Sequence, residues 1–297
     1  MRIAFIIHGR KKRKYAVEKS IEPYLRSGDI AAYFETTHSS HGTTLARQCF
    51  SEADVIVPIG GDGLFHECLN GWMQARIEIS HELILPVMVP WPCGSGNDFA
   101  RNYLWKDDAV HVMSRVYGNQ TQKVDVGRIA FEDRQIIYFL NEMSIGLGPE
   151  VVKHVSELPP HWSGGIKFGL GIIKAFFTFK KKVIEVSWNE NANHRDKTMA
   201  FVVANGKYFG SGLGIAPTAL VDDGKLNLTI IGDVSLFDYL KQLGKLKSCK
   251  VIHHPEVKYD VSNDIVIHSS NAMESDGEWI GYGPAKISLI KQALWMR

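Results

Sequence analysis

Strand and helix patterns alternate through the first 123 residues of this 297-residue chain. Short apolar runs typical of buried strands are separated by stretches that have the apolar spacing of helices. The strand-like runs are RIAFII, AAYFET, DVIVPI and LILPVMVP, and the helical stretches are Tyr15–Leu25, Thr44–Glu52, Leu64–Ala75 and Asp107–Tyr117. Such alternation is typical of βαβ units, whose strands form a parallel sheet. We therefore expect an α/β domain with a mostly parallel sheet over residues 1–123.

The pattern changes near Lys123–Gly127, where we place the domain boundary. Residues 124–297 are rich in strand-like runs and contain two helical stretches, near Gly165–Phe179 and Leu236–Leu246. The strand-like runs are QIIYFLNEMS, KVIEVSW, TMAFVVANG, KLNLTIIG, DIVIHSS and AKISLI. This pattern predicts a β-sandwich or a β-rich α+β domain.

The composition is ordinary for a globular protein, with 45% hydrophobic and 22% charged residues. The net charge of +2 does not call for a nucleic-acid partner. Four scattered cysteines without a C-x-x-C pair argue against a zinc or disulfide framework and favour a reducing cytoplasm. We find no apolar run of about 20 residues, the length that a membrane span requires. We expect a cytoplasmic protein, for which peripheral contact with the inner membrane face and a homodimer are both open.

Two glycine-containing loops follow strands of the expected sheet: Gly60-Gly61-Asp62-Gly63 and Gly94-Ser95-Gly96-Asn97. Ligands of α/β sheets bind beyond the C-terminal ends of the strands, and glycines let a ligand approach the main chain closely. The start of the next helix offers N–H groups to a phosphate. Together the loops predict a site that holds one polyanion from two sides. The alternative for the first loop is a tight turn in which Asp62 caps the helix.

These segments resemble the catalytic family of diacylglycerol kinases, which includes bacterial lipid kinases, sphingosine kinases and ceramide kinases. The matching segments are GGDG with Glu67, Asn70 and Gly71, then PCGSGNDFAR, VDVGRI, PTALVDDG and SDGEW. The resemblance covers almost the whole chain. It implies a phosphofructokinase-like N-terminal domain and a C-terminal β-sandwich for lipid and metal, with ATP in the cleft between them.

The resemblance also implies the site residues. Those expected to bind the nucleotide are Thr37, Gly60, Gly61, Asp62, Gly63, Leu64, Glu67, Gly94, Ser95, Gly96 and Asn97. In the loop PTALVDDG, a Mg²⁺ ion would be held by the Asp223 carboxylate and the main-chain carbonyls of Leu220 and Lys225. A plain turn is the alternative for this loop.

The implied reaction transfers the γ-phosphate of ATP to a hydroxyl of diacylglycerol or a related lipid. Glu278 is the first candidate for the general base, and Asp62 is the second, acting directly or through Mg²⁺. A hairpin turn at Asp276-Gly277 is compatible with this role, because a hairpin tip can present a carboxylate. A non-catalytic lipid- or nucleotide-binding protein of the same fold is the main alternative. An NAD kinase is a weaker one, since NAD kinases share GGDG but lack GNDFAR.

The sequence departs from the family pattern in three places. His8-Gly9 replace Asn-Pro and precede the basic run Arg10–Lys14, which is either a solvated loop or a segment that faces phosphates or lipid headgroups. Ser95 replaces threonine and keeps the hydroxyl. Leu64 replaces the threonine of GGDGT. If Leu64 faces the ligand, Leu64→Thr should raise kcat/KM for ATP, whereas if Leu64 is packed, the same change should lower stability.

The acceptor-lipid site is poorly marked in the sequence. The apolar stretch HWSGGIKFGLGIIKAFFTF predicts a helix packed on the sandwich. The alternative is a wall of an acyl-chain cleft near a membrane surface.

Overall fold

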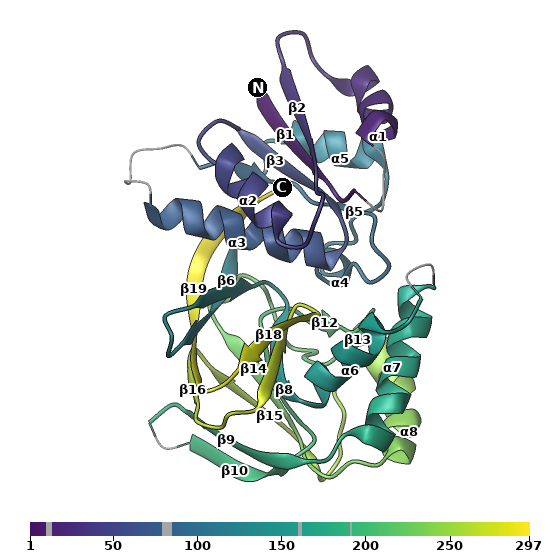
Figure 1. The fold of residues 1–297 in the computed structure, drawn as a ribbon, viewed down its shortest axis with the longest axis vertical. Coiled ribbons are helices and arrows are strands. Elements are labelled where there is room, and N and C mark those ends of the chain that lie inside the picture. Colours follow the sequence, from purple (N-terminus) through teal and green to yellow (C-terminus); the bar gives the residue numbers. More distant parts are fainter. Residues whose placement is uncertain (10–13, 79–84, 160–161, 191) are drawn as a thin grey trace. The chain divides into compact units, whose positions relative to one another are not determined.

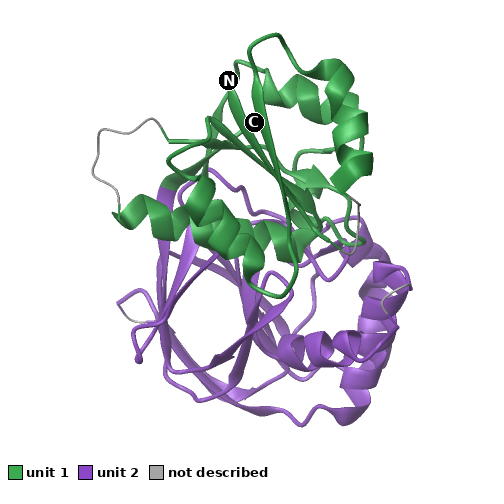
Figure 2. Ribbon diagram, turned by 45° about the horizontal axis from the view of Figure 1, so that its top comes forward, with its two compact units in different colours: residues 1–124, 292–297 green, residues 125–291 purple. Residues whose placement is uncertain are grey.

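The computed structural model describes residues 1–9, 14–78, 85–159, 162–190 and 192–297. The chain forms two compact units (Figures 1 and 2). Unit 1 comprises Met1–Val124 and Gln292–Arg297, and unit 2 comprises Asp125–Lys291. Of the basic run, residues 10–13 lie outside the described residues, and Lys14 is the first residue of a helix.

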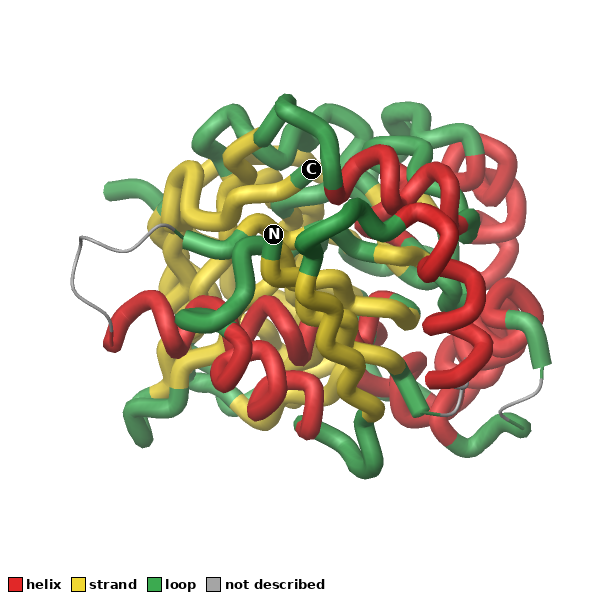
Figure 3. The backbone as a smooth tube through the Cα atoms, turned by 90° about the horizontal axis from the view of Figure 1, so that it is seen from above, coloured by secondary structure: helices red, strands yellow, loops and turns green. Residues whose placement is uncertain are grey.

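Unit 1 contains a parallel sheet and its helices. Its elements are β1 (Arg2–Ile7), α1 (Lys14–Ile21), the 3-10 turn Glu22–Tyr24, β2 (Ile30–Glu35), α2 (His41–Cys49), β3 (Val55–Gly60), α3 (Asp62–Glu78), β4 (Val87–Met88), β5 (Trp91–Pro92), α4 (Asp98–Arg101), α5 (Ala109–Val116) and the start of β6 (Gln122–Phe131). The strands run in the order β4-β3-β1-β2, and every neighbouring pair is parallel. β2 lies beside β1, which begins next to the N-terminus (Figure 3).

Helices cover both faces of this sheet, because alternate residues of a strand point to opposite sides. On one face, Phe5 and Val57 belong to a buried cluster that includes residues of α1 and α5. On the other face, Ile6 and Ile56 are fully buried, and α2 and α3 pack against β1 and β3. The expected α/β domain with a parallel sheet is confirmed.

The predicted strand LILPVMVP is much shorter than expected. Only Val87–Met88 forms a strand, followed by the separate strand Trp91–Pro92. Pro86 and Pro90 flank the first strand, and a proline has no N–H to donate to a sheet ladder. Residues 83–84 of the predicted strand lie outside the described residues.

The C-terminal residues 292–297 belong to unit 1, whereas we had placed the whole of 124–297 in the second domain. Met296 pairs in parallel with Met88, at the edge of the unit 1 sheet. The Arg115 guanidinium donates to the carbonyls of Arg297, at 2.9 Å, and Pro90, at 2.8 Å. Strand β19 (Ala285–Met296) therefore begins in unit 2 and ends in unit 1.

Unit 2 is a β-sandwich, and its described residues include three helices. Its elements are the rest of β6, β7 (Ile136–Phe139), β8 (Glu142–Gly146), α6 (Leu147–Ser156), α7 (Gly164–Thr178), β9 (Lys182–Trp188), β10 (Ala192–Thr198), β11 (Ala200–Ala204), β12 (Tyr208–Phe209), β13 (Leu213–Gly214), β14 (Leu226–Ile231), α8 (Leu236–Lys247), β15 (Val257–Ser262), β16 (Asp264–Ile267), β17 (Ala272–Ser275), β18 (Glu278–Tyr282) and most of β19. One antiparallel sheet has the order β15-β14-β11-β8-β17-β18. The second sheet is built from β10, β9, β16 and β19, and β6 and β7 join it beside β19.

The core of unit 2 lies between the two sheets. Ile184, Val186 and Trp188 alternate along β9 and point into it. From the other sheet, Phe201 and Met273 enter the same cluster. The expected β-sandwich is confirmed.

Two of the three helices of unit 2 lie where the sequence predicts them, and α6 was missed. Its first residues are Leu-Gly-Pro, and a proline is tolerated in the first turn of a helix. None of the helices in the described part of the chain is long and apolar enough to span a bilayer.

Candidate active site

The two glycine loops of unit 1 touch each other through their main chains. Gly60 of β3 pairs with Pro92 of β5, so the loops leave neighbouring strands side by side. A Cβ atom added to Gly94 would lie 2.3 Å from the Cα atom of Gly61, and one added to Gly61 would lie 3.0 Å from the Cα atom of Gly94. No real Cβ atom tolerates the shorter distance. The glycines are therefore needed for the loops to approach each other.

The second loop is held in shape by its own side chains. Asn97 has a φ of 53°, and its Oδ1 atom accepts from the Gly94 N–H at 2.9 Å. Its Nδ2 atom donates to the Gly94 carbonyl at 3.0 Å, and Arg101 Nε donates to the Gly96 carbonyl at 3.1 Å. The Asn97 amide thus closes the loop. The predicted nucleotide contacts of this loop would then come mainly from its main chain.

Asp62 connects the first loop to the helix that follows the second. One of its carboxylate oxygens accepts from the Phe99 N–H, at 3.3 Å, in the first turn of α4. The rings of Phe65 and Phe99 pack edge to face beside it, with their centroids 5.3 Å apart. Gly60, Gly61, Asp62 and Asn97 line a small hollow at this point. The first N–H groups of any α-helix lack an intrahelical partner. Helix α3 begins at Asp62, so its first N–H groups lie in this part of the first loop.

Leu64 is a packing residue. Its side chain is 4% exposed. A Cβ atom added to Gly60 would lie 2.8 Å from Leu64 Cδ2, and one added to Gly42 would lie 2.8 Å from Leu64 Cδ1. The leucine therefore fills the space between the end of β3 and the start of α2. Any contact of residue 64 with nucleotide would be left to its main chain.

Glu67 caps α2 from the neighbouring helix α3. Its Oε1 atom accepts from the Ser40 N–H at 2.7 Å, and its Oε2 atom accepts from the Gly42 N–H at 2.8 Å. These N–H groups lie at the start of a helix, where no intrahelical acceptor exists. The predicted nucleotide role of Glu67 would thus act through the loop that it holds.

Thr37 lies in the same loop, between β2 and α2, and is exposed. Its N–H donates to His41 Nδ1 at 3.1 Å, and its hydroxyl lies 2.9 Å from His38 Nδ1. The rings of His38 and His41 are stacked, with centroids 4.6 Å apart. Thr37 therefore lies in the loop whose Ser40 N–H group is held by Glu67. The main-chain geometry of this loop depends on that glutamate.

The predicted catalytic residue Glu278 lies at the tip of the β17–β18 hairpin in unit 2. Asp276 and Gly277 have φ angles of 50° and 85° and form the turn, as the alternative reading of this segment predicted. Glu278 follows as the exposed first residue of β18. The Asp276 carboxylate accepts from the N–H groups of Leu140, Asn141 and Glu142 at 3.0, 2.9 and 3.2 Å. Glu278 is therefore presented from a firmly anchored turn.

The buried carboxyl group of Glu274 holds this hairpin turn through hydrogen bonds. The Ser144 hydroxyl donates to one of its oxygens, and the Gly277 N–H donates to the other at 3.2 Å. Burial raises the pKa of Glu274 to about 7, although its hydrogen bonds to Ser144 and Glu142 oppose this rise. Glu274 and Ser144 were not among the site residues predicted from the sequence. Two acidic residues at alternate positions in ESD, at the end of a strand, were the available signal.

The loop of Asp223 forms a turn. The exposed Asp223 carboxylate accepts from the Lys225 N–H at 3.0 Å, and Gly224 has a φ of 73°. The Gly224 N–H donates to the fully buried Asp125 carboxylate at 2.7 Å, a contact that the sequence analysis missed. Asn263 Nδ2 donates to the Gly224 carbonyl at 2.7 Å.

The donors at this turn are of the kind that Mg²⁺ prefers. Asp223 offers a carboxylate, and Leu220 and Lys225 offer main-chain carbonyls. In the described part of the chain, no group of three or more His, Cys, Asp or Glu side chains could hold a metal. An ion at this turn would therefore rest on one carboxylate and on carbonyl oxygens.

Comparison with known families decides the relationship. Residues 2–129 match the diacylglycerol kinase catalytic domain, and residues 141–296 match the YegS C-terminal NAD kinase beta sandwich-like domain. The chain belongs to the diacylglycerol kinase family. Within this family, it is 22% identical over 294 residues to the diacylglycerol kinase of Bacillus subtilis, covering 96% of this chain and 93% of that protein. It is 24% identical over 272 residues to the diacylglycerol kinase of Staphylococcus haemolyticus, covering 90% and 78%.

The fold of the family is shared as well. A crystal structure described as a diacylglycerol kinase from Bacillus anthracis superposes with a TM-score of 0.71, at 17% identity, and covers 99% of this chain and 96% of that one. At this identity the likeness speaks for the fold alone. The family assignment agrees with the motifs that carried the resemblance in the sequence.

Proposed function

We propose that this protein is an ATP-dependent lipid kinase that phosphorylates the hydroxyl of diacylglycerol or a related lipid. The observation that carries the proposal is the contact between Gly61 and Gly94, which brings both glycine loops of the family motif to one place beside Asp62. The names of the related kinases support the same reaction class.

The phosphates of ATP would lie on the main chain of the two loops and the start of α3. N–H groups and the helix dipole favour negative charge there. The lipid hydroxyl oxygen would attack the γ-phosphorus while the bond from that phosphorus to the β-γ bridging oxygen breaks, which releases ADP. Glu278 would take the hydroxyl proton, since it is exposed and held on an anchored turn.

Phosphoryl transfer depends mainly on positioning and charge neutralisation. Mg²⁺, when bound, would supply part of that neutralisation at the phosphates. Asp62 would help to orient it, and the Asp223 turn would hold a second, structural ion. These roles follow from the oxygen donors at the two places.

The test is transfer of radiolabel from [γ-³²P]ATP to a panel of diacylglycerol, phosphatidylglycerol, sphingosine and ceramide. We expect a labelled lipid that depends on Mg²⁺, and none with Asp62→Asn. If ATP binds but no lipid in the panel is labelled, a non-catalytic binding protein becomes the better interpretation. Labelling of NAD instead of lipid would favour the NAD kinase alternative.

A further inference from the structure

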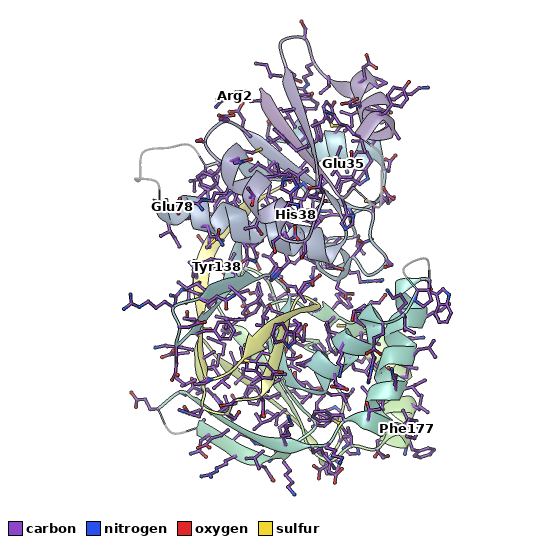
Figure 4. The ribbon with its side chains drawn as sticks, in the orientation of Figure 1. Arg2, Glu35, His38, Glu78, Tyr138 and Phe177 are labelled. Carbon is purple, nitrogen blue, oxygen red and sulfur yellow. The ribbon has the colours of Figure 1, made fainter. Side chains whose placement is uncertain are left out.

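Helix α7 presents an apolar stripe to solvent. Ile166, Leu170, Ile173 and Phe177 are 57, 43, 39 and 77% exposed. Their spacing of four, three and four residues places them on one face of the helix. Figure 4 shows the Phe177 side chain pointing outward from this part of unit 2. Single exposed apolar residues are normal, but a contiguous stripe marks an interaction surface.

The opposite face of α7 is packed. Ile172 and Ala175 are buried in a cluster with Leu246 of α8, and the Phe176 ring lies 5.6 Å from the Tyr239 ring of α8. Figure 1 shows the two helices as neighbours. The prediction of a helix packed on the sandwich therefore accounts for one face of α7 and leaves the stripe unexplained.

The segment that carries the stripe has charged side chains of one sign only. Residues 162–182 contain five lysines and no acidic residue, whereas the whole chain carries +2, so the other residues together carry −3. Lys174 pairs with Glu157, and Lys181 pairs with Asp233. Lys167, Lys180 and Lys182 have no ion pair with any described residue. Positive charge is thus concentrated on the segment that carries the stripe.

We propose that the α7 stripe docks this protein on an anionic lipid bilayer. This inference builds on the proposed lipid kinase function. The apolar side chains enter the boundary between headgroups and acyl chains, and the lysines lie level with the anionic headgroups. A second copy of the chain fits this surface less well, because two faces with the same positive charge repel each other.

Vesicle flotation tests the proposal, with vesicles of phosphatidylcholine alone or mixed equally with phosphatidylglycerol. The wild-type protein should float with the mixed vesicles and float less with the neutral ones. Ile166→Asp and Phe177→Asp should each reduce the bound fraction on the order of tenfold, because burial of one such side chain supplies about that factor. Ile77→Asp is the matched control, since Ile77 is also a helical isoleucine and is 66% exposed, but lies in unit 1. It should float like the wild type.

The charge contribution has its own test. Lys167→Gln with Lys180→Gln should weaken binding to the mixed vesicles by roughly fivefold per lysine, and should leave binding to neutral vesicles unchanged. Raised salt should have the same effect on the wild type. Lys180 is exposed and Lys167 is half-buried with its charge at the surface, so the melting temperatures of these variants should stay close to that of the wild type.

The proposal is overturned if the wild type does not float, or if Ile166→Asp and Phe177→Asp float as well as Ile77→Asp. If the wild type does not bind vesicles but is a dimer in sedimentation equilibrium, and Ile166→Asp dissociates that dimer whereas Ile77→Asp does not, the stripe is instead a contact with a second copy of the chain. Phosphorylation of a short-chain diacylglycerol in detergent is measured in parallel. Activity there without flotation defeats only the docking surface, whereas flotation without phosphorylation of any lipid defeats only the kinase function.

Discussion

The Cα atom of Gly61 lies 2.3 Å from the position that a Cβ atom on Gly94 would occupy. The two glycine loops are therefore in direct main-chain contact. We had expected the loops to hold a polyanion from two sides, with the glycines making room for the ligand. The structure shows a further role for Gly61 and Gly94, because the absence of a Cβ atom at each lets the two loops pack against each other.

Gly94→Ala tests this contact. We expect the free energy of unfolding to fall by about 1–3 kcal/mol, because the added methyl group meets main-chain atoms that cannot move independently. ATP affinity should fall with it. Urea denaturation and calorimetry measure the two effects. Gly244→Ala is the control: nothing lies within 4 Å of its added Cβ, and alanine in a helix should raise stability by about 0.5–1 kcal/mol. Equal stability of Gly94→Ala and wild type would contradict the loop contact.

Leu64→Thr distinguishes packing from catalysis. The 4% exposure of Leu64 leads us to expect a loss of stability of about 1–3 kcal/mol, because threonine is smaller and adds a hydroxyl to an apolar space. The kcat/KM for ATP should not rise. The melting temperature and ATP kinetics of the same variant decide the matter. A higher kcat/KM at unchanged stability would show that residue 64 faces the nucleotide after all.

Glu278→Gln tests the proposed general base. Glutamine keeps the size of the side chain but cannot take the proton, so kcat should fall by roughly 10²–10⁴-fold while ATP affinity stays the same. Glu132→Gln is a suitable control, because Glu132 is an exposed glutamate at another hairpin turn of unit 2. Near-normal kcat in Glu278→Gln would transfer the base assignment to Asp62.

The buried Glu274 should make stability depend on pH. Its pKa is raised by burial from 4.5 to about 7, so the folded protein keeps a proton that the unfolded chain releases. Its contribution to the free energy of unfolding is therefore complete below pH 4.5, falls between 4.5 and about 7, and is lost above that range. The total change is about 3 kcal/mol at most, at roughly 1.4 kcal/mol per pKa unit.

Glu274→Gln isolates this contribution. Glutamine does not titrate, so the difference in unfolding free energy between wild type and variant should change across this pH range. Urea titrations from pH 4 to about 8 measure it. A difference that is constant with pH would show that Glu274 titrates normally in the folded protein.

Asp223→Ala tests the metal turn. Mg²⁺ should raise the melting temperature of the wild type relative to EDTA, because a ligand of the folded state stabilises it. The variant should lose this increase, together with the hydrogen bond from the Lys225 N–H. Asp222→Ala, at the neighbouring exposed aspartate, should keep the Mg²⁺ effect. An equal increase in all three proteins would place the ion elsewhere.

Local patterns in the sequence were enough to predict the fold class and to identify the family motif. Strand RIAFII and the helix after GGDG formed as predicted, because apolar periodicity and glycine position act over a few residues. The β-sandwich followed from alternation of the kind seen in β9. The hairpin at Asp276-Gly277 was also foreseeable, since its two residues adopt positive φ readily.

Only the tertiary structure decided what individual motif residues do. Glu67 caps a helix 25 residues earlier in the chain, and Leu64 fills a space beside Gly42. The return of Met296 to Met88 in unit 1 depends on a pairing across more than half the chain. Burial of Glu274, and the exposure of one face of α7, depend likewise on what packs around them. Such contacts join residues far apart in sequence, so no local pattern encodes them.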